Sequence, residues 1–130
     1  MSKKIIITTK APAAVGPYSQ GVRVGDMIYS AQVGIVPGTK DFAGPDIETQ
    51  TCQILENLSA ILEEAGSCLQ CVVKTTVFLQ DIGEFSQMNK VYAEFFPEEP
   101  PARSAVEVAA LPLRARVMIE VVAGACECDT

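Results

Sequence analysis

A long amphipathic helix is the feature that most constrains how this chain folds. Apolar residues recur at helical spacing behind Asp46, a residue type that caps helix N-termini, and Gly66 ends the pattern. A helix that is apolar on one side must pack on another element, and we expect this helix to cover one face of a sheet. The apolar stripe consists of Ile47, Thr51, Ile54, Leu55, Leu58, Ile61, Leu62 and Ala65.

Short runs rich in β-branched residues before and after this helix predict the strands. Strands are expected at residues 3–8, 21–24, 27–31 and 72–79, and two more after Pro100, at about 103–109 and 114–122. Gly25-Asp26 predicts a hairpin turn between the second and third strands.

A second helix is expected to start at a capping box, Asp81-Ile82-Gly83-Glu84, and to end at Pro97. Its aromatic residues are expected to lie in the core, whereas Asn89 sits off the apolar stripe. The order is then βββαβαββ. It predicts a single domain over residues 1–130 of the α+β class, two layers deep, with a six-stranded mixed sheet and both helices on one face.

Two helices leave the other face of such a sheet uncovered. The strands are apolar enough that this face would form a large exposed patch, which monomeric proteins rarely tolerate. We therefore expect an oligomer that packs sheet faces together, and sites at such interfaces can combine charged residues of different chains.

The last two strands each carry a charge among apolar neighbours. If residues 110–113 form a turn, an antiparallel register sets Arg103 opposite Glu120 and Glu107 opposite Arg116. Arg103 cannot lose its charge and needs an anion beside it. The pattern fits either two cross-strand ion pairs or a functional site, and it does not decide between them.

Composition excludes several classes of function. The 130 residues include no histidine, which removes Ser-His-Asp and Cys-His catalysis and histidine-ligated metals. The net charge is −6 and the basic residues are scattered, so a surface that tracks nucleic-acid phosphates is not expected. No apolar run has the length of a membrane span, and Ile5-Ile6-Ile7 is too short for a signal peptide. A cytoplasmic location is the default expectation.

Five cysteines leave a metal site as an alternative. Cys68 and Cys71 have CxxC spacing, so a sulfur-only zinc site with Cys126 and Cys128 is conceivable. The second pair, however, is CxC near a C-terminus that we expect to fray, and Leu-Gln inside the first pair is unlike a zinc knuckle. With Cys52 the count is odd, which favours reduced thiols. We therefore predict no metal.

Four segments together resemble the RidA (YjgF/YER057c/UK114) family. They are Gly16-Pro17-Tyr18-Ser19-Gln20, Val73-Lys74-Thr75-Thr76-Val77, Pro101-Ala102-Arg103-Ser104 and Ile119-Glu120. The resemblance implies a chorismate-mutase-like fold and a homotrimer with clefts between subunits. It also implies deamination of 2-aminoacrylate and related enamines or imines to 2-oxo acids and ammonia, with no metal, no organic cofactor and no catalytic cysteine.

The resemblance also implies site residues. Tyr18, Asn89, Arg103 and Glu120 match pocket positions of the family, and Ser30 with Ala31 matches a segment whose backbone lines the pocket. Three positions depart from the family pattern: Ala31 replaces a glycine, Ala105 replaces a cysteine common in bacterial members, and Met118 replaces a glutamate. We expect these changes to affect substrate range more than activity.

The chemistry of these residues agrees with that implication. The planar guanidinium of Arg103 can hold a substrate carboxylate by two parallel hydrogen bonds. Glu120 can manage the protons of a water that attacks the C=N bond, with the Tyr18 hydroxyl beside it. Asn89, Ser30, Ala31 and Ala105 are expected to bind the substrate together with Arg103. Two alternatives stay open: a ligand-binding or chaperone-like trimer without turnover, and a translation inhibitor or endoribonuclease, which the acidic composition disfavours.

Overall fold

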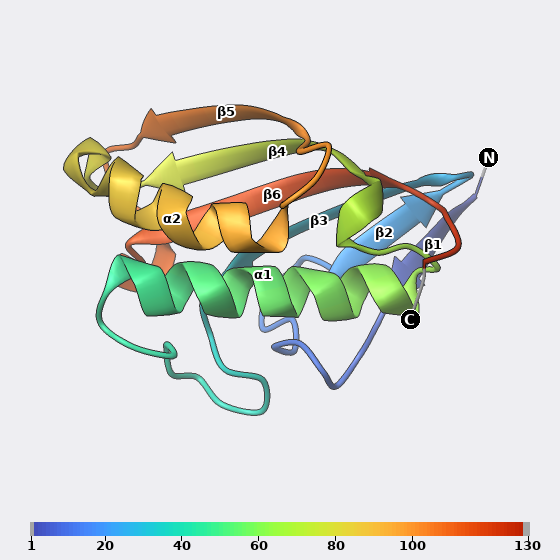
Figure 1. Cartoon of the computed structure of the whole chain (residues 1–130). Coiled ribbons are helices and arrows are strands. Elements are labelled where there is room, and N and C mark those ends of the chain that lie inside the picture. The colour runs from blue at the N-terminus through green and yellow to red at the C-terminus, as the bar shows by residue number, and fades with distance from the viewer. Residues whose placement is uncertain (1, 129–130) are drawn as a thin grey trace.

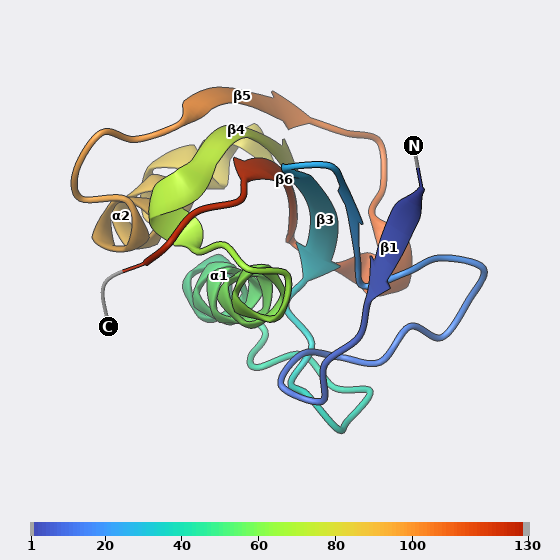
Figure 2. The same cartoon turned by 90° about the vertical axis from the view of Figure 1, so that its right-hand side faces the viewer.

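The structure, a computed structural model, describes residues 2–128 as a two-layer α+β fold (Figure 1). One six-stranded mixed sheet has the strand order β1-β2-β3-β6-β4-β5. Both helices lie on the same face of the sheet (Figures 1 and 2), so the predicted fold class is confirmed. The elements are β1 (Lys3–Ile6), β2 (Gly21–Val24), β3 (Met27–Val33), α1 (Ile47–Glu64), β4 (Val72–Leu79), α2 (Phe85–Phe95), β5 (Ala102–Glu107) and β6 (Val117–Gly124).

Helix α1 covers the centre of the sheet, as its apolar stripe predicts. All eight residues of that stripe are buried, and all except Thr51 pack with β-strand residues in one core. Asp46 caps the helix, since its Oδ2 accepts a hydrogen bond from the Thr49 amide at 3.0 Å. Gly66 follows the helix with a φ of +86°, a conformation that favours glycine. Among residues 2–128, no helix is both long and apolar enough to cross a membrane.

The start of α2 differs from the predicted capping box. Asp81 accepts from the Gly83 amide at 2.8 Å, and this bond stabilises one turn of 3-10 helix, Ile82–Glu84, in front of α2. The Glu84 side chain does not accept a hydrogen bond from the Asp81 amide, as a capping box requires, because its carboxylate forms a two-pronged ion pair with Arg116. The Nε–Oε1 and Nη2–Oε2 distances are 2.8 and 2.6 Å.

The predicted hairpin of the last two strands is wrong, because β4 lies between them. β5 pairs in parallel with β4, where Arg103 lies beside Thr75. β6 pairs antiparallel with both β3 and β4, where Glu120 lies beside Ala31 and Thr76. The ion pair expected between Arg103 and Glu120 therefore does not form within the chain.

The connection from β5 to β6 explains this placement. Instead of a tight turn, residues 108–116 pass across the end of β4. There the Val108 amide donates to the Leu79 carbonyl at 2.9 Å, and the Gln80 amide donates to the Arg116 carbonyl at 3.0 Å. The expected pair of Glu107 and Arg116 is wrong as well: Glu107 accepts from the Ile82 amide at 2.9 Å, and Arg116 binds Glu84.

The second face of the sheet carries no helix among the described residues (Figure 2). We call it the open face. Its side chains include Tyr29 and Val106, which are 47% and 43% exposed, and the partly exposed Phe78, Met118 and Val122. An apolar surface of this kind agrees with the expectation that another chain covers it.

Candidate functional site

Arg103 is held on the helix side of the sheet by three residues of α2. Its Nη1 donates to Asn89 Oδ1 at 2.7 Å. Its guanidinium carbon lies 4.7 Å from the ring centroid of Tyr92 and 5.2 Å from that of Phe85. Phe85, Asn89 and Tyr92 are four and three residues apart, a spacing that puts them on one helix face. The helix thus fixes the plane of the guanidinium.

Tyr92 links this arrangement to the sheet. Its hydroxyl shares a 2.8 Å hydrogen bond with Thr75 Oγ1, and both residues are buried. Burial raises the pKa of Tyr92, although the Thr75 hydrogen bond and the nearby charge of Arg103 oppose that rise. The ring is therefore neutral near pH 7, and its face interacts with the cation as a quadrupole.

Arg103 keeps donors for a ligand. Within residues 2–128 it forms no ion pair, and neither Nε nor Nη2 donates a hydrogen bond to the protein. A guanidinium with two such nitrogens can bind a planar carboxylate in a bidentate manner. We call Arg103, Asn89, Phe85 and Tyr92 the arginine cluster.

Glu120 belongs to a separate depression on the open face. The depression has a volume of about 330 Å³, and Glu120 is exposed in it. Lys74 also lines it, with Nζ donating to Ser104 Oγ at 3.0 Å and to the Thr75 carbonyl at 3.2 Å. The full lining is Tyr29, Ser30, Ala31, Lys74, Thr76, Glu120, Val121 and Val122.

The strand register shows that Arg103 and Glu120 lie on opposite faces of the sheet. Strand pairing aligns Arg103 with Thr75, Val121 and Ser30 across the sheet. The side chains of those three residues are buried under the helices. Glu120 is adjacent to Val121 in β6. Because adjacent residues of a strand point to opposite faces, Glu120 points to the open face. A ligand bound to one chain therefore cannot touch both charges through the sheet.

The remaining expected site residues are dispersed. Tyr18 is 57% exposed on the loop between β1 and β2, where its hydroxyl accepts from the Val15 amide at 3.3 Å. It lines another hollow, of about 450 Å³, that contains neither Arg103 nor Glu120. Ser30 Oγ donates to the Gln20 carbonyl at 2.6 Å, and Ala105 packs against the core. Ala31 lies beside Glu120.

Four residues that contact the predicted site were not identified from the sequence. Phe85 and Tyr92 were expected only as core aromatics, although their spacing from Asn89 places them on its helix face. Thr75 and Lys74 lie in a segment that resembles the family, but nothing in their local pattern indicates a contact with Tyr92 or with the depression.

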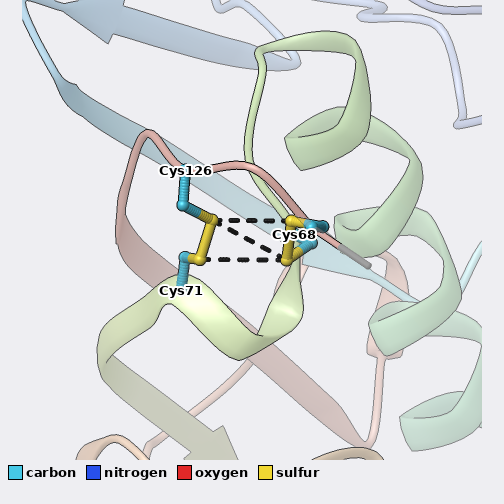
Figure 3. Close-up of side chains that lie close together, drawn as sticks. Cys68, Cys71 and Cys126 are labelled. Atoms are coloured by element: carbon cyan, nitrogen blue, oxygen red, sulfur yellow. Dashed lines mark hydrogen bonds between the residues drawn. A yellow bond between two sulfur atoms is a disulfide. The ribbon is translucent and has the colours of Figure 1, made fainter. Parts of the chain in front are cut away.

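Four of the five cysteines meet beside the start of β4 and the end of β6, and Figure 3 labels three of them, Cys68, Cys71 and Cys126. The structure joins Cys68 to Cys128 and Cys71 to Cys126 as disulfides, so the expectation of reduced thiols is wrong for these four. Cys52 is a free thiol on α1, and its pKa is raised by burial and by the neighbouring Glu56 carboxylate. A raised pKa keeps that thiol protonated and unreactive.

Comparison with known proteins identifies the family. Residues 8–125 match the family model described as endoribonuclease L-PSP. A RutC family protein of Pyrococcus abyssi is 48% identical over 95% of this chain and 98% of its own length. The 2-iminobutanoate/2-iminopropanoate deaminase of Mus musculus is 47% identical over 93% of this chain and 90% of its own.

A solved structure agrees with these matches. The crystal structure of E. coli TdcF with bound serine superimposes with a TM-score of 0.89 at 40% identity, covering 93% of this chain and 98% of that one. Sequence and fold therefore match along almost the whole chain, and the resemblance noted in the sequence is confirmed. The chain belongs to the RidA (YjgF/YER057c/UK114) family.

Proposed function

We propose that this protein hydrolyses 2-aminoacrylate and related 2-imino acids, such as 2-iminopropanoate and 2-iminobutanoate, to 2-oxo acids and ammonia. The observation that carries the proposal is the arginine cluster: a guanidinium oriented by Asn89 and two rings, with no carboxylate partner among residues 2–128. A substrate carboxylate supplies that partner. The name of the mouse relative and the serine bound to TdcF both support a small amino-acid-like ligand.

The reaction needs positioning more than a strong nucleophile. The enamine 2-aminoacrylate takes up a proton at its terminal carbon and becomes the iminium of 2-iminopropanoate. Water then adds to the C=N carbon, Glu120 accepts a proton from that water, and the resulting carbinolamine expels ammonia as the carbonyl forms. Because the iminium is already electrophilic, holding water and substrate together supplies much of the acceleration. These steps require no metal or organic cofactor.

The complete site requires two chains. Arg103 and Glu120 lie on opposite faces of one sheet, so one subunit would supply the arginine cluster and its neighbour would supply Glu120. The uncovered open face supports such an assembly, and we propose a homotrimer with one site in each of its clefts. Tyr18, on an exposed loop, would reach the site from one of the two subunits.

A coupled assay tests the activity. A lyase that releases 2-aminoacrylate from serine is run with and without the protein, and formation of pyruvate and ammonia is followed. We expect the wild-type protein to raise the rate and Glu120→Gln, which keeps the shape but loses the base, to lose most of that increase. Binding of substrate analogues without any increase in rate would instead favour a ligand-binding protein.

The family description makes ribonuclease activity the other outcome to test. Nonspecific RNA affinity depends on basic contacts, and the chain has a net charge of −6 with no histidine. We therefore expect no salt-dependent retention of RNA and no cleavage by protein that is active in the imine assay.

A further inference from the structure

The four-cysteine cluster combines two short motifs that are far apart in sequence. Cys68 caps the single-turn helix η1 (Leu69–Cys71) in front of β4, and Cys71 is the last residue of that helix, while Cys126 and Cys128 follow β6. All four sulfur atoms lie within 4.8 Å of one another (Figure 3). None of these residues belongs to the arginine cluster or lines the depression around Glu120.

Three of the sulfur–sulfur distances between the two disulfides are close to those of a tetrahedral metal site. Zn–S bonds of about 2.3 Å in a tetrahedron place the sulfurs about 3.8 Å apart. In the structure, Cys68 Sγ lies 3.8 Å from both Cys71 Sγ and Cys126 Sγ, and Cys126 Sγ lies 3.5 Å from Cys128 Sγ. Four sulfurs that all lie within 4.8 Å of one another are close enough for one ion to bind all of them.

Backbone contacts hold the two motifs together independently of the sulfurs. The Cys126 amide donates to the Gly66 carbonyl at 3.1 Å, and the Ala125 amide donates to the Asp26 carbonyl at 2.7 Å. Ser67 Oγ donates to the Gly124 carbonyl at 2.6 Å. The chain is therefore not frayed at Cys126, and one of the three reasons for expecting no metal is removed.

We propose that, when its four cysteines are reduced, this cluster binds one Zn²⁺ through the thiolates of Cys68, Cys71, Cys126 and Cys128. Four protein ligands leave no open position, so the ion is structural and ties the C-terminal tail to the α1–β4 connection. The disulfide form uses the same four sulfurs, so a chain holds either the ion or the disulfides. The proposal does not depend on the deaminase activity.

Metal binding by the reduced protein tests the site. A phosphine reductant donates four electrons to the two disulfides and gives four thiols, and Zn²⁺ then displaces their protons. We expect anaerobic titration followed by elemental analysis to find about one zinc ion per chain. Cobalt added in place of zinc should show the intense thiolate-to-metal charge-transfer bands of a tetrahedral sulfur site.

Two variants separate this cluster from other thiols. Cys126→Ser should reduce bound metal to less than about a tenth of the wild-type amount, because one ligand is lost. Cys52→Ser is the matched control and should retain the full amount. Circular dichroism verifies folding, and Cys128→Ser replaces Cys126→Ser if the latter does not fold.

Several results would overturn the proposal. The proposal would be wrong if folded, reduced wild-type protein bound neither zinc nor cobalt. It would also be wrong if both Cys126→Ser and Cys128→Ser bound as much metal as the wild type. Iron found in place of zinc would support the thiolate site and overturn zinc as its metal. Each readout is metal content or absorbance, so loss of imine hydrolysis alone leaves the result unchanged.

Discussion

The guanidinium of Arg103 lies between two aromatic rings and the Asn89 amide, and this determines what its removal should do. Each ring contributes about 0.5–1 kcal/mol at a partly exposed site. Because Glu120 lies on the other face, removing Arg103 leaves no buried carboxylate unpaired. The cost of about 3–5 kcal/mol for breaking a buried ion pair therefore does not apply.

Arg103→Ala should consequently abolish most activity while the protein stays folded. Loss of a bidentate charged contact of about 2–3 kcal/mol lowers kcat/KM roughly a hundredfold. Arg103→Lys should recover little, since an ammonium keeps the charge and loses the two-pronged geometry. Imine hydrolysis, melting temperature and oligomer mass are measured on the same sample.

The matched control is Lys90→Ala, which removes an exposed cation from the residue after Asn89. It should keep nearly full activity. A folded Arg103→Ala protein with wild-type kcat/KM would remove Arg103 from the proposed site.

At the scale of elements, the Asp46 cap at the N-terminus of α1 makes the stability of the fold depend on pH. Hydrogen bonds from the Thr49 amide and hydroxyl lower the pKa of Asp46. A carboxyl whose pKa is lower in the folded state stabilises the fold above its unfolded pKa of about 3.9, and that stabilisation is lost as the pH falls through the lowered folded pKa.

Asp46→Ala should therefore lower the melting temperature at pH 7, and the difference from wild type should shrink below about pH 4. Asp46→Asn is the control, because asparagine caps a helix without a titrating charge. Thermal melts across this pH range measure both. A difference that is constant with pH would show that the Asp46 charge contributes nothing.

The close approach of Gly34, the residue after β3, to α1 gives a second element-scale prediction. A Cβ added to the buried Gly34 would lie 2.7 Å from the Gln50 carbonyl oxygen and 2.9 Å from Gln50 Cα. These atoms are backbone and cannot rotate away, so Gly34→Ala should destabilise the fold by about 1–3 kcal/mol.

Gly124→Ala is the matched control for this change, since nothing lies within 4 Å of a Cβ at that position. Denaturant unfolding of both variants measures the difference. Equal free energies of unfolding for Gly34→Ala and Gly124→Ala would mean that α1 can move away from Gly34 without loss of stability.

The elements differ in how far the sequence predicts them. Helix α1 was predictable because periodicity and capping are local, and its stripe is buried as expected. The position of β4 between β5 and β6 was not predictable, because strand pairing is set by contacts far apart in sequence. Leu113 and Arg114 have φ values of 57° and 60° in the link, which no local residue preference indicates.

The same distinction applies to the site. Arg103 and Asn89 were predicted and do contact each other. The expected position of Arg103 opposite Glu120 was wrong, because the face to which a residue points depends on which strands pair and in what register. The expectation that the chain frays after β6 is wrong for a related reason: hydrogen bonds to residues distant in sequence hold Ala125 and Cys126 in place.

For the whole molecule, the open face predicts assembly. Light scattering should give a mass of about three times the 13.9 kDa of one chain. Tyr29 lies on the open face and is 47% exposed, so Tyr29→Glu would place a charge in the interface. We expect this variant to dissociate and to lose imine hydrolysis, because its site needs two chains.

Ile82→Glu serves as the control for this variant, since Ile82 is 49% exposed but lies outside the sheet. It should remain a trimer. A wild-type protein that is a stable monomer at micromolar concentration would contradict the shared site.

The central position of β6 affects how the chain folds while it is being synthesised. A growing chain that still lacks residues 117–124 holds only a meander of β1, β2 and β3 and a separate β4–β5 pair. Each piece then presents an unpaired strand edge of the kind that recruits other chains. The sheet can close only after its middle strand leaves the ribosome, so newly made chains depend on rapid closure to avoid aggregation.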